Sequence, residues 1–145
     1  NGKGNRIDSA RINALLEDIT AKKDPWRAEW LDADFKVIGG KLHINYDHRI
    51  VGGTLKPQKS EPLQDCLMSD KTPGIDLDYW LKNATPQGLP PSSTPDGNLY
   101  YWHPIEGRVA RFGADSGRVF LYCIGDPQCS DSGLGVRAAK ILRRR

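Results

Sequence analysis

The sequence predicts a single α+β domain in which short helices come before a loop-rich group of antiparallel strands. Helical spacing of apolar residues occurs mostly before residue 85, strand-like alternation occurs mostly after residue 97, and no βαβ alternation is present. The 145 residues, 38% of them hydrophobic, can bury one core but not two, so we expect one domain over residues 1–145. The 15 glycines and 10 prolines follow no period and favour many turns.

The first half of the chain is expected to contain three helices and one hairpin. Apolar residues at helical spacing predict a helix over residues 8–21. Alternating apolar residues on both sides of Gly39–Gly40 predict a hairpin over Phe35–Tyr46, because glycine adopts the positive φ of a two-residue turn at little cost. Two short helices are expected to open at Ser60 and at Asp76, each followed by an apolar stripe.

The second half is expected to be rich in strands. Thr85–Gly97 contains too many prolines for a helix or a central strand and predicts an ordered loop. Four apolar segments that follow it are expected to be strands, the last of them closing the sheet: 98–102, 108–112, 118–124 and 134–142.

The segment 118–124 is the most informative of these strands. If its odd-numbered residues Val119, Leu121 and Cys123 face the core, alternation turns the even-numbered residues outward. Exposed aromatic side chains beside an arginine are typical of binding surfaces. The alternative is that the Pro-rich loop or the short helices cover this row. The row comprises Arg118, Phe120, Tyr122 and Ile124.

The charge distribution disfavours a nucleic-acid partner, and the hydropathy disfavours insertion into a membrane. The formal net charge is +3, but five of the basic residues fall within the last nine positions and leave the rest of the chain slightly acidic. A basic tip on an acidic body is a poor footprint for nucleic acid. No apolar run approaches the length needed to cross a bilayer, and the first ten residues hold no apolar signal core. We therefore expect no nucleic-acid partner, no membrane insertion and no targeting segment.

The residues capable of catalysis or metal binding are scattered. Cys66, Cys123 and Cys129 form neither a disulfide framework nor a zinc motif. No nucleophile, phosphate-loop or metalloprotease motif is present, and the spacing of the histidines favours surface or capping roles over metal binding. We expect no enzymatic activity, no catalytic residue, no metal and no cofactor. The histidines are His43, His48 and His103.

Short motifs in residues 108–142 resemble the variable region of diversity-generating retroelement target proteins. The motifs are Val109-Ala110-Arg111, the turn Asp126-Pro127, and Leu134-Gly135-Val136-Arg137. The resemblance implies a C-type lectin-type fold with a variable region at residues 100–138. Two enzymatic or metal-binding activities known on that fold are not supported, because the cysteine context of formylglycine-generating oxidases and the EPN and WND triplets of calcium lectins are both absent.

In such a family, selected codons are rewritten while the intervening residues hold the backbone. The resemblance assigns the ligand-binding, diversified positions to Glu106, Arg108, Arg118, Phe120, Tyr122, Ile124, Gly125, Asp126, Gln128, Cys129, Ser130 and Asp131. It assigns the scaffold to Val109, Ala110, Phe112, Leu121, Cys123, Pro127, Leu134, Gly135, Val136 and Arg137.

The function implied is receptor recognition. The resemblance implies a ligand-binding protein of a virion or cell surface whose partner is a macromolecule, a cell-surface protein or a glycan. The alternative is a small enzyme or a structural subunit of a viral or surface assembly, in which the same row would be a buried packing face. Solvent exposure of Phe120, Tyr122 and Ile124 distinguishes the two.

Overall fold

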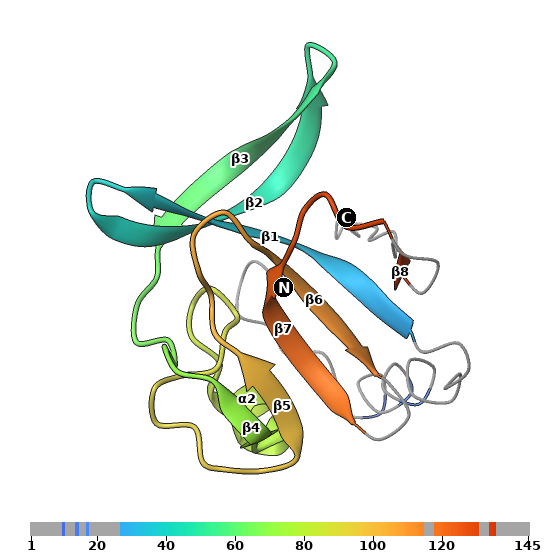
Figure 1. Cartoon of the computed structure of the whole chain (residues 1–145). Coiled ribbons are helices and arrows are strands. Elements are labelled where there is room, and N and C mark those ends of the chain that lie inside the picture. Colours follow the sequence, from blue (N-terminus) through green and yellow to red (C-terminus); the bar gives the residue numbers. More distant parts are fainter. Residues whose placement is uncertain are drawn as a thin grey trace, which may run out of the picture.

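One mixed β-sheet dominates the fold, and the short helix α2 packs on one of its faces (Figure 1). The computed structural model describes residues 27–114, 118–130 and 134–135, together with Ala10, Ala14 and Glu17. The strands follow the order β3-β2-β1-β6-β7-β5-β4, and β8 pairs with β1 beside this path. The elements are β1 (Arg27–Ile38), β2 (Lys41–Val51), β3 (Thr54–Pro62), β4 (Lys71–Ile75), α2 (Leu77–Asn83), β5 (Leu99–Trp102), β6 (Val109–Ala114), β7 (Val119–Gly125) and β8 (Leu134–Gly135).

The expected antiparallel pairing holds for most strand pairs, but the sheet is mixed and not divided into small antiparallel sheets. The described strands form a single sheet in which β5 runs parallel to β7 and β8 runs parallel to β1, while the other pairs are antiparallel. The connection from β5 to β6 accounts for the first parallel pair. It carries the chain past β7, so that β6 pairs antiparallel on one edge of β7 and β5 lies on the other. The described part is therefore a mostly-sheet domain that is only broadly α+β.

The predicted hairpin is confirmed as β1 and β2. Gly39 and Gly40 form its turn with φ of 58° and 77°. A second glycine pair, Gly52–Gly53, returns the chain as β3, which the sequence analysis did not predict. The helix expected to open at Ser60 is wrong, because Ser60 pairs with Asn45 in the β2–β3 ladder. Hydrogen bonds across the β2–β3 hairpin have replaced the local capping signal.

Residues 46–59 extend the β2–β3 hairpin beyond β1, and we call them the arm (Figure 1). His48 lies at the base of the arm, with its ring nitrogens 2.5 Å from Asp32 Oδ1 and 3.1 Å from Asp34 Oδ2. These contacts join the arm to β1. At the far end, Ile50 and Leu55 are paired across the strands and are 70% and 61% exposed.

The remaining predicted elements are mostly in place. Asp76 caps α2, and its Oδ1 accepts a hydrogen bond from the Tyr79 amide at 2.7 Å, as expected. Residues 85–97 are irregular, while β5, β6 and β7 begin and end within two residues of their predicted bounds. Strand β4 was not predicted.

Two predicted elements lie largely outside the described residues. Of the helix expected over 8–21, only Ala10, Ala14 and Glu17 are described, and they are helical. Of the closing strand expected over 134–142, only Leu134–Gly135 is described, as β8.

The hydrophobic core lies between the sheet and the segment that contains α2 and the Pro-rich loop. Tyr101 is fully buried in it and donates a hydrogen bond from its hydroxyl to Leu67 O at 2.7 Å. Burial raises the pKa of the Cys66 thiol to about 11 and also raises the pKa of the Cys123 thiol, so both remain protonated at neutral pH. The core comprises Phe35, Ile44, Cys66, Leu67, Ile75, Leu89, Leu99, Tyr101, Ala110, Leu121 and Cys123.

Gly74 is predicted to be far less replaceable than Gly53. Both have positive φ, but a Cβ on Gly74 would lie 2.3 Å from the carbonyl oxygen of Leu99, whereas nothing lies within 4 Å of a Cβ on Gly53. Gly53→Ala should cost about 1–2 kcal/mol of unfolding free energy, and Gly74→Ala roughly 2–5 kcal/mol, because overpacking adds to backbone strain. Urea denaturation of the two variants checks this. Equal losses of unfolding free energy in the two variants would contradict the close approach of Gly74 in β4 to Leu99 in β5.

The stability of the domain is predicted to depend on the ionisation of Glu61. Tyr46 donates a hydrogen bond to Glu61 Oε1 and Gln87 donates one to Oε2, and these bonds, the first above all, hold the pKa of the Glu61 carboxyl below its usual value of 4.5. A lowered folded-state pKa gives stability that is present above the unfolded pKa and is lost as pH falls through the folded value. Tyr46→Phe should raise the pKa of Glu61 and shrink the loss of stability below pH 4.5. NMR titration of the Glu61 carboxyl carbon measures this pKa in the wild type and in the variant. An unchanged pKa would contradict the hydrogen bond from Tyr46 to Glu61.

Candidate functional site

The face of the sheet opposite α2 carries aromatic and arginine side chains. Leu99 and Tyr101 in β5, and Leu121 and Cys123 in β7, point into the core, so the residues alternating with them point to the other side. The register aligns them, with Tyr100 opposite Phe120 and Trp102 opposite Tyr122. We call this side the aromatic face. It comprises Trp30, Tyr100, Trp102, Arg111, Arg118, Phe120 and Tyr122.

Trp102 lies at the centre of the aromatic cluster. Its ring centroid is 5.2 Å from that of Tyr122 and 6.4 Å from that of Phe120, both in edge-to-face arrangements. Tyr100 stacks on it at 6.0 Å. Such pairs favour these relative orientations of the rings.

Two arginines lie over these rings. The Arg111 guanidinium carbon is 5.1 Å from the Trp30 ring centroid and 4.7 Å from that of Tyr122. Arg118 lies 5.4 Å from Tyr100 and 5.8 Å from Trp102. All four distances are within the range of cation–π attraction, and the two arginines add positive charge to the aromatic face.

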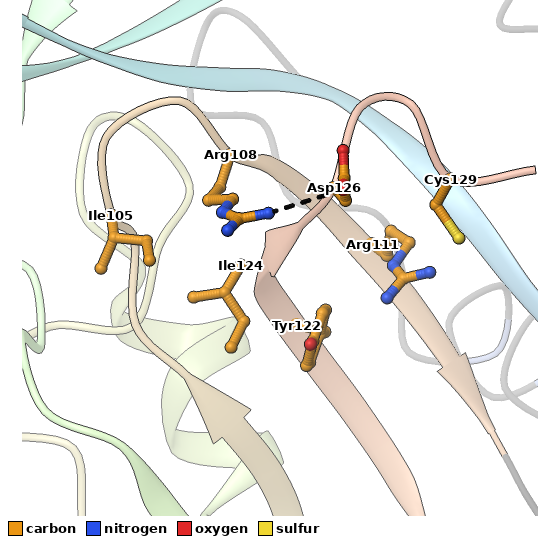
Figure 2. A pocket seen from close by; sticks show the side chains of 7 residues that line it. All are labelled: Ile105, Arg108, Arg111, Tyr122, Ile124, Asp126 and Cys129. Carbon is orange, nitrogen blue, oxygen red and sulfur yellow. Dashed lines mark ion pairs between the residues drawn. The ribbon is translucent and has the colours of Figure 1, made fainter.

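A hollow of about 360 Å³ opens beside Tyr122, where β6 begins and β7 ends (Figure 2). Its walls combine two arginines with apolar side chains. Arg108 Nη1 is 3.9 Å from Asp126 Oδ2, so one of the two arginines faces a carboxylate, and both members of this pair are substantially exposed. The lining residues are Ile105, Arg108, Arg111, Tyr122, Ile124, Asp126 and Cys129.

Five predicted ligand-binding positions line this hollow: Arg108, Tyr122, Ile124, Asp126 and Cys129. Gln128 and Ser130 are exposed in the turn that follows, and this turn is ordered by hydrogen bonds from the Gln128 amide to Asp126 Oδ1 at 2.9 Å and from the Cys129 amide to Asp126 O at 3.0 Å.

The other predicted positions lie outside the hollow. Glu106 is exposed and accepts a hydrogen bond from the Val37 amide at 3.3 Å, near β1. Arg118 is exposed over the aromatic rings. Asp131 lies outside the described residues.

Two of the predicted positions need correction. Phe120 points away from the core, but only 8% of it is exposed, because neighbouring rings pack against it. Gly125 is buried, and a Cβ on it would lie 2.6 Å from Val109 O and 2.9 Å from the Trp30 ring. Neither position can accept varied side chains freely. The outward row is therefore partly covered, with Tyr122 and Ile124 half-buried.

Several residues of this face were not predicted from the sequence. Ile105 and Arg111 line the hollow but were not among the predicted positions. Trp30, Tyr100 and Trp102 were missed as well. Alternation within Leu99–Trp102 was a sufficient signal for the two β5 aromatics, since the pattern that buries Tyr101 turns its neighbours to the opposite side. Trp30 belongs to a distant strand and gave no local signal.

The histidines lie in hydrogen-bonded pairs away from the hollow. His103 Nδ1 is 2.6 Å from Asp70 Oδ1, and His43 Nδ1 is 3.0 Å from Lys41 O. Within residues 27–114, 118–130 and 134–135, no three His, Cys, Asp or Glu side chains gather as they would around a metal ion. The described site offers a ligand aromatic rings, positive charge and apolar side chains.

Comparison with family models, curated proteins and solved structures gave no match to this chain. The resemblance to retroelement target proteins stays a prediction. No helix among the described residues is long and apolar enough to cross a membrane.

Phe120 and Gln128 are predicted to differ sharply in their effect on stability. Phe120→Ala removes a buried ring from the aromatic cluster and should cost roughly 3–5 kcal/mol of unfolding free energy. Gln128→Ala changes an exposed side chain and should cost no more than about 0.5 kcal/mol. Thermal melts compare them. A mild effect of Phe120→Ala would show that this ring lies open to solvent.

Proposed function

We propose that the domain is a non-enzymatic recognition module that binds a macromolecular ligand on the aromatic face, with the hollow beside Tyr122 as its centre. The observation that carries the proposal is the hollow itself, which combines two arginines, apolar walls and five sequence-predicted binding positions on the face that the core leaves unused. Half-buried aromatic residues with arginines are the composition of binding hot spots.

The same arrangement supports diversification of this surface on a fixed scaffold. Ala110, Leu121 and Cys123 are buried in the core, while residues alternating with them reach the hollow. The exposed residues Gln128, Cys129 and Ser130 lie in a turn outside the strands, where side chains can change without altering the ladder. These features support the proposal that the chain is a variable protein of a diversity-generating retroelement. Its partner would be a cell-surface protein or a glycan, and it would be located on a virion or a cell surface.

The order of elements supports a C-type lectin-type fold. A hairpin, a short helix and an irregular loop come before three strands of the same sheet. The genetic part of the proposal is tested by nucleotide sequence. A near-copy of the segment encoding residues 100–138, beside a reverse transcriptase gene and differing mainly at adenines, would support it. A locus without such a copy would contradict diversification, but not ligand binding.

A variant with four positions at the hollow and its turn replaced together is predicted to keep its fold. The positions are Ile124, Asp126, Gln128 and Ser130, each changed to alanine. The exposed Gln128 and Ser130 should cost no more than about 0.5 kcal/mol each, and Asp126 about 1 kcal/mol, because its Oδ1 accepts a hydrogen bond from the Gln128 amide. Because Ile124 is half-buried, its replacement should account for the largest part of the loss in unfolding free energy. Thermal melting and proteolysis of the purified variant, and of a display library randomised at the same positions, measure the tolerance. A drop as large as that of Phe120→Ala would show a packing face and contradict the display surface.

A second function, as a subunit of an assembly, is favoured by the arm. Ile50, Val51 and Leu55 are 70%, 45% and 61% exposed at the tip of a hairpin that projects past β1 (Figure 1). Apolar side chains paired across an unsupported hairpin are typical of contacts with another chain.

Under this second function, the arm mediates self-association. The double variant Ile50→Ser with Leu55→Ser should lower the molar mass measured by light scattering at high concentration. Val37→Ser with Ile38→Ser, which changes 41% and 44% exposed residues at the other hairpin turn, is the matched control and should leave the mass unchanged. A wild-type protein that is monomeric at all concentrations would contradict this role.

A further inference from the structure

We infer that Arg111 is the anchoring donor for a single oxoanion of the ligand, a carboxylate, sulfate or phosphate. The inference rests on the proposed binding at the hollow and adds the chemical class of the group that is bound there.

The guanidinium of Arg111 is held in place before a ligand arrives. It lies between the rings of Trp30 and Tyr122, 5.1 Å and 4.7 Å from their centroids. Gly125 allows this position, because a Cβ there would come within 3.1 Å of Arg111 Nε and 2.9 Å of the Trp30 ring. The side chain therefore loses little conformational freedom when it binds, which favours affinity.

The same guanidinium has no acceptor within the described residues. Its Nε is buried and makes no hydrogen bond, and no carboxylate among these residues forms an ion pair with Arg111. The carboxylate in the hollow, Asp126, instead faces Arg108 at 3.9 Å. A buried N–H group without an acceptor is costly, and a ligand oxygen that reaches Arg111 Nε would remove this cost.

Geometry and charge then select the ligand group. The Nε and the neighbouring terminal nitrogen of a guanidinium present a planar fork that fits two oxygens of an oxoanion, and both hydrogen bonds are strengthened by charge. Two arginines and one aspartate leave the hollow with an excess positive charge. A ligand cation would be repelled, and a neutral hydroxyl would satisfy only part of the fork.

The probes are acetate, sulfate and methylphosphonate, titrated at constant ionic strength against sodium chloride. The first readout is the Nε–Hε NMR signal of Arg111 in ¹⁵N-labelled full-length protein. The second is the rate at which iodoacetamide alkylates Cys129, an exposed thiol that lines the hollow. At least one oxoanion should shift the signal saturably and slow alkylation, and the anion with the lowest Kd identifies the ligand group.

Variants make the result specific. Arg111→Gln should weaken oxoanion binding at least tenfold, and Arg111→Lys should weaken it less, because a lysine keeps the charge without the fork. Arg49→Gln, which removes an exposed arginine paired with Asp47 in the arm, is the matched control and should leave Kd unchanged. Thermal melts establish that each variant is folded.

The inference is overturned if no oxoanion saturates either readout, or if Arg111→Gln binds as the wild type does. Its failure is distinguishable from that of the proposed function. If members of the display library bind immobilised macromolecules through the hollow while oxoanions do not bind, recognition stands and the oxoanion assignment falls. If the variant with Ile124, Asp126, Gln128 and Ser130 replaced together unfolds, the recognition face itself is wrong.

Discussion

The parallel pairing of β5 with β7 aligns the side chains that form the core with one another and those that form the aromatic cluster with one another. It aligns Tyr101 with Leu121 on the core side and Trp102 with Tyr122 on the aromatic side. Because side chains alternate, a shift of one residue would turn both sets to the wrong faces. The pairing is fixed from the core, where the Tyr101 hydroxyl reaches Leu67 O and Gly74 lets β4 approach Leu99 closely.

Once the register is fixed, the second face assembles around rings and arginines. Trp30, Arg111, Tyr122 and Trp102 come from four adjacent strands and lie in one cross-strand row. Apolar and aromatic packing gives this row its rigidity, and the two arginines give it charge. The hollow opens where the row meets the turn after β7, so its walls combine a fixed strand with a replaceable loop.

Local signals predicted the local features of the fold. Gly39–Gly40 and Asp76 have sequence signatures that act within a few residues, and the hairpin turn and the capped helix are both present. The signature at Ser60 is of the same kind but failed, because pairing with Asn45 offered the backbone a more complete set of hydrogen bonds. The strand order could not be predicted, because β1 and β6 are neighbours in the sheet but lie far apart in the sequence, and no local pattern encodes such a pairing. Alternation placed Phe120 on the correct side but could not show that Trp102 and Tyr122 cover it.

The division of the sheet into a core face and a binding face is tested most directly by hydroxyl-radical footprinting of the native protein, with the oxidised residues identified by mass spectrometry. Adjacent aromatic residues of β5 provide an internal comparison, because Tyr101 is fully buried whereas Tyr100 and Trp102 are half-buried on the other side. We expect oxidation of Trp102 and Tyr122 with protection of Tyr101. Equal protection of all three would show that the aromatic face is a second buried interface, and oxidation of Tyr101 would show that the register of β5 with β7 is wrong.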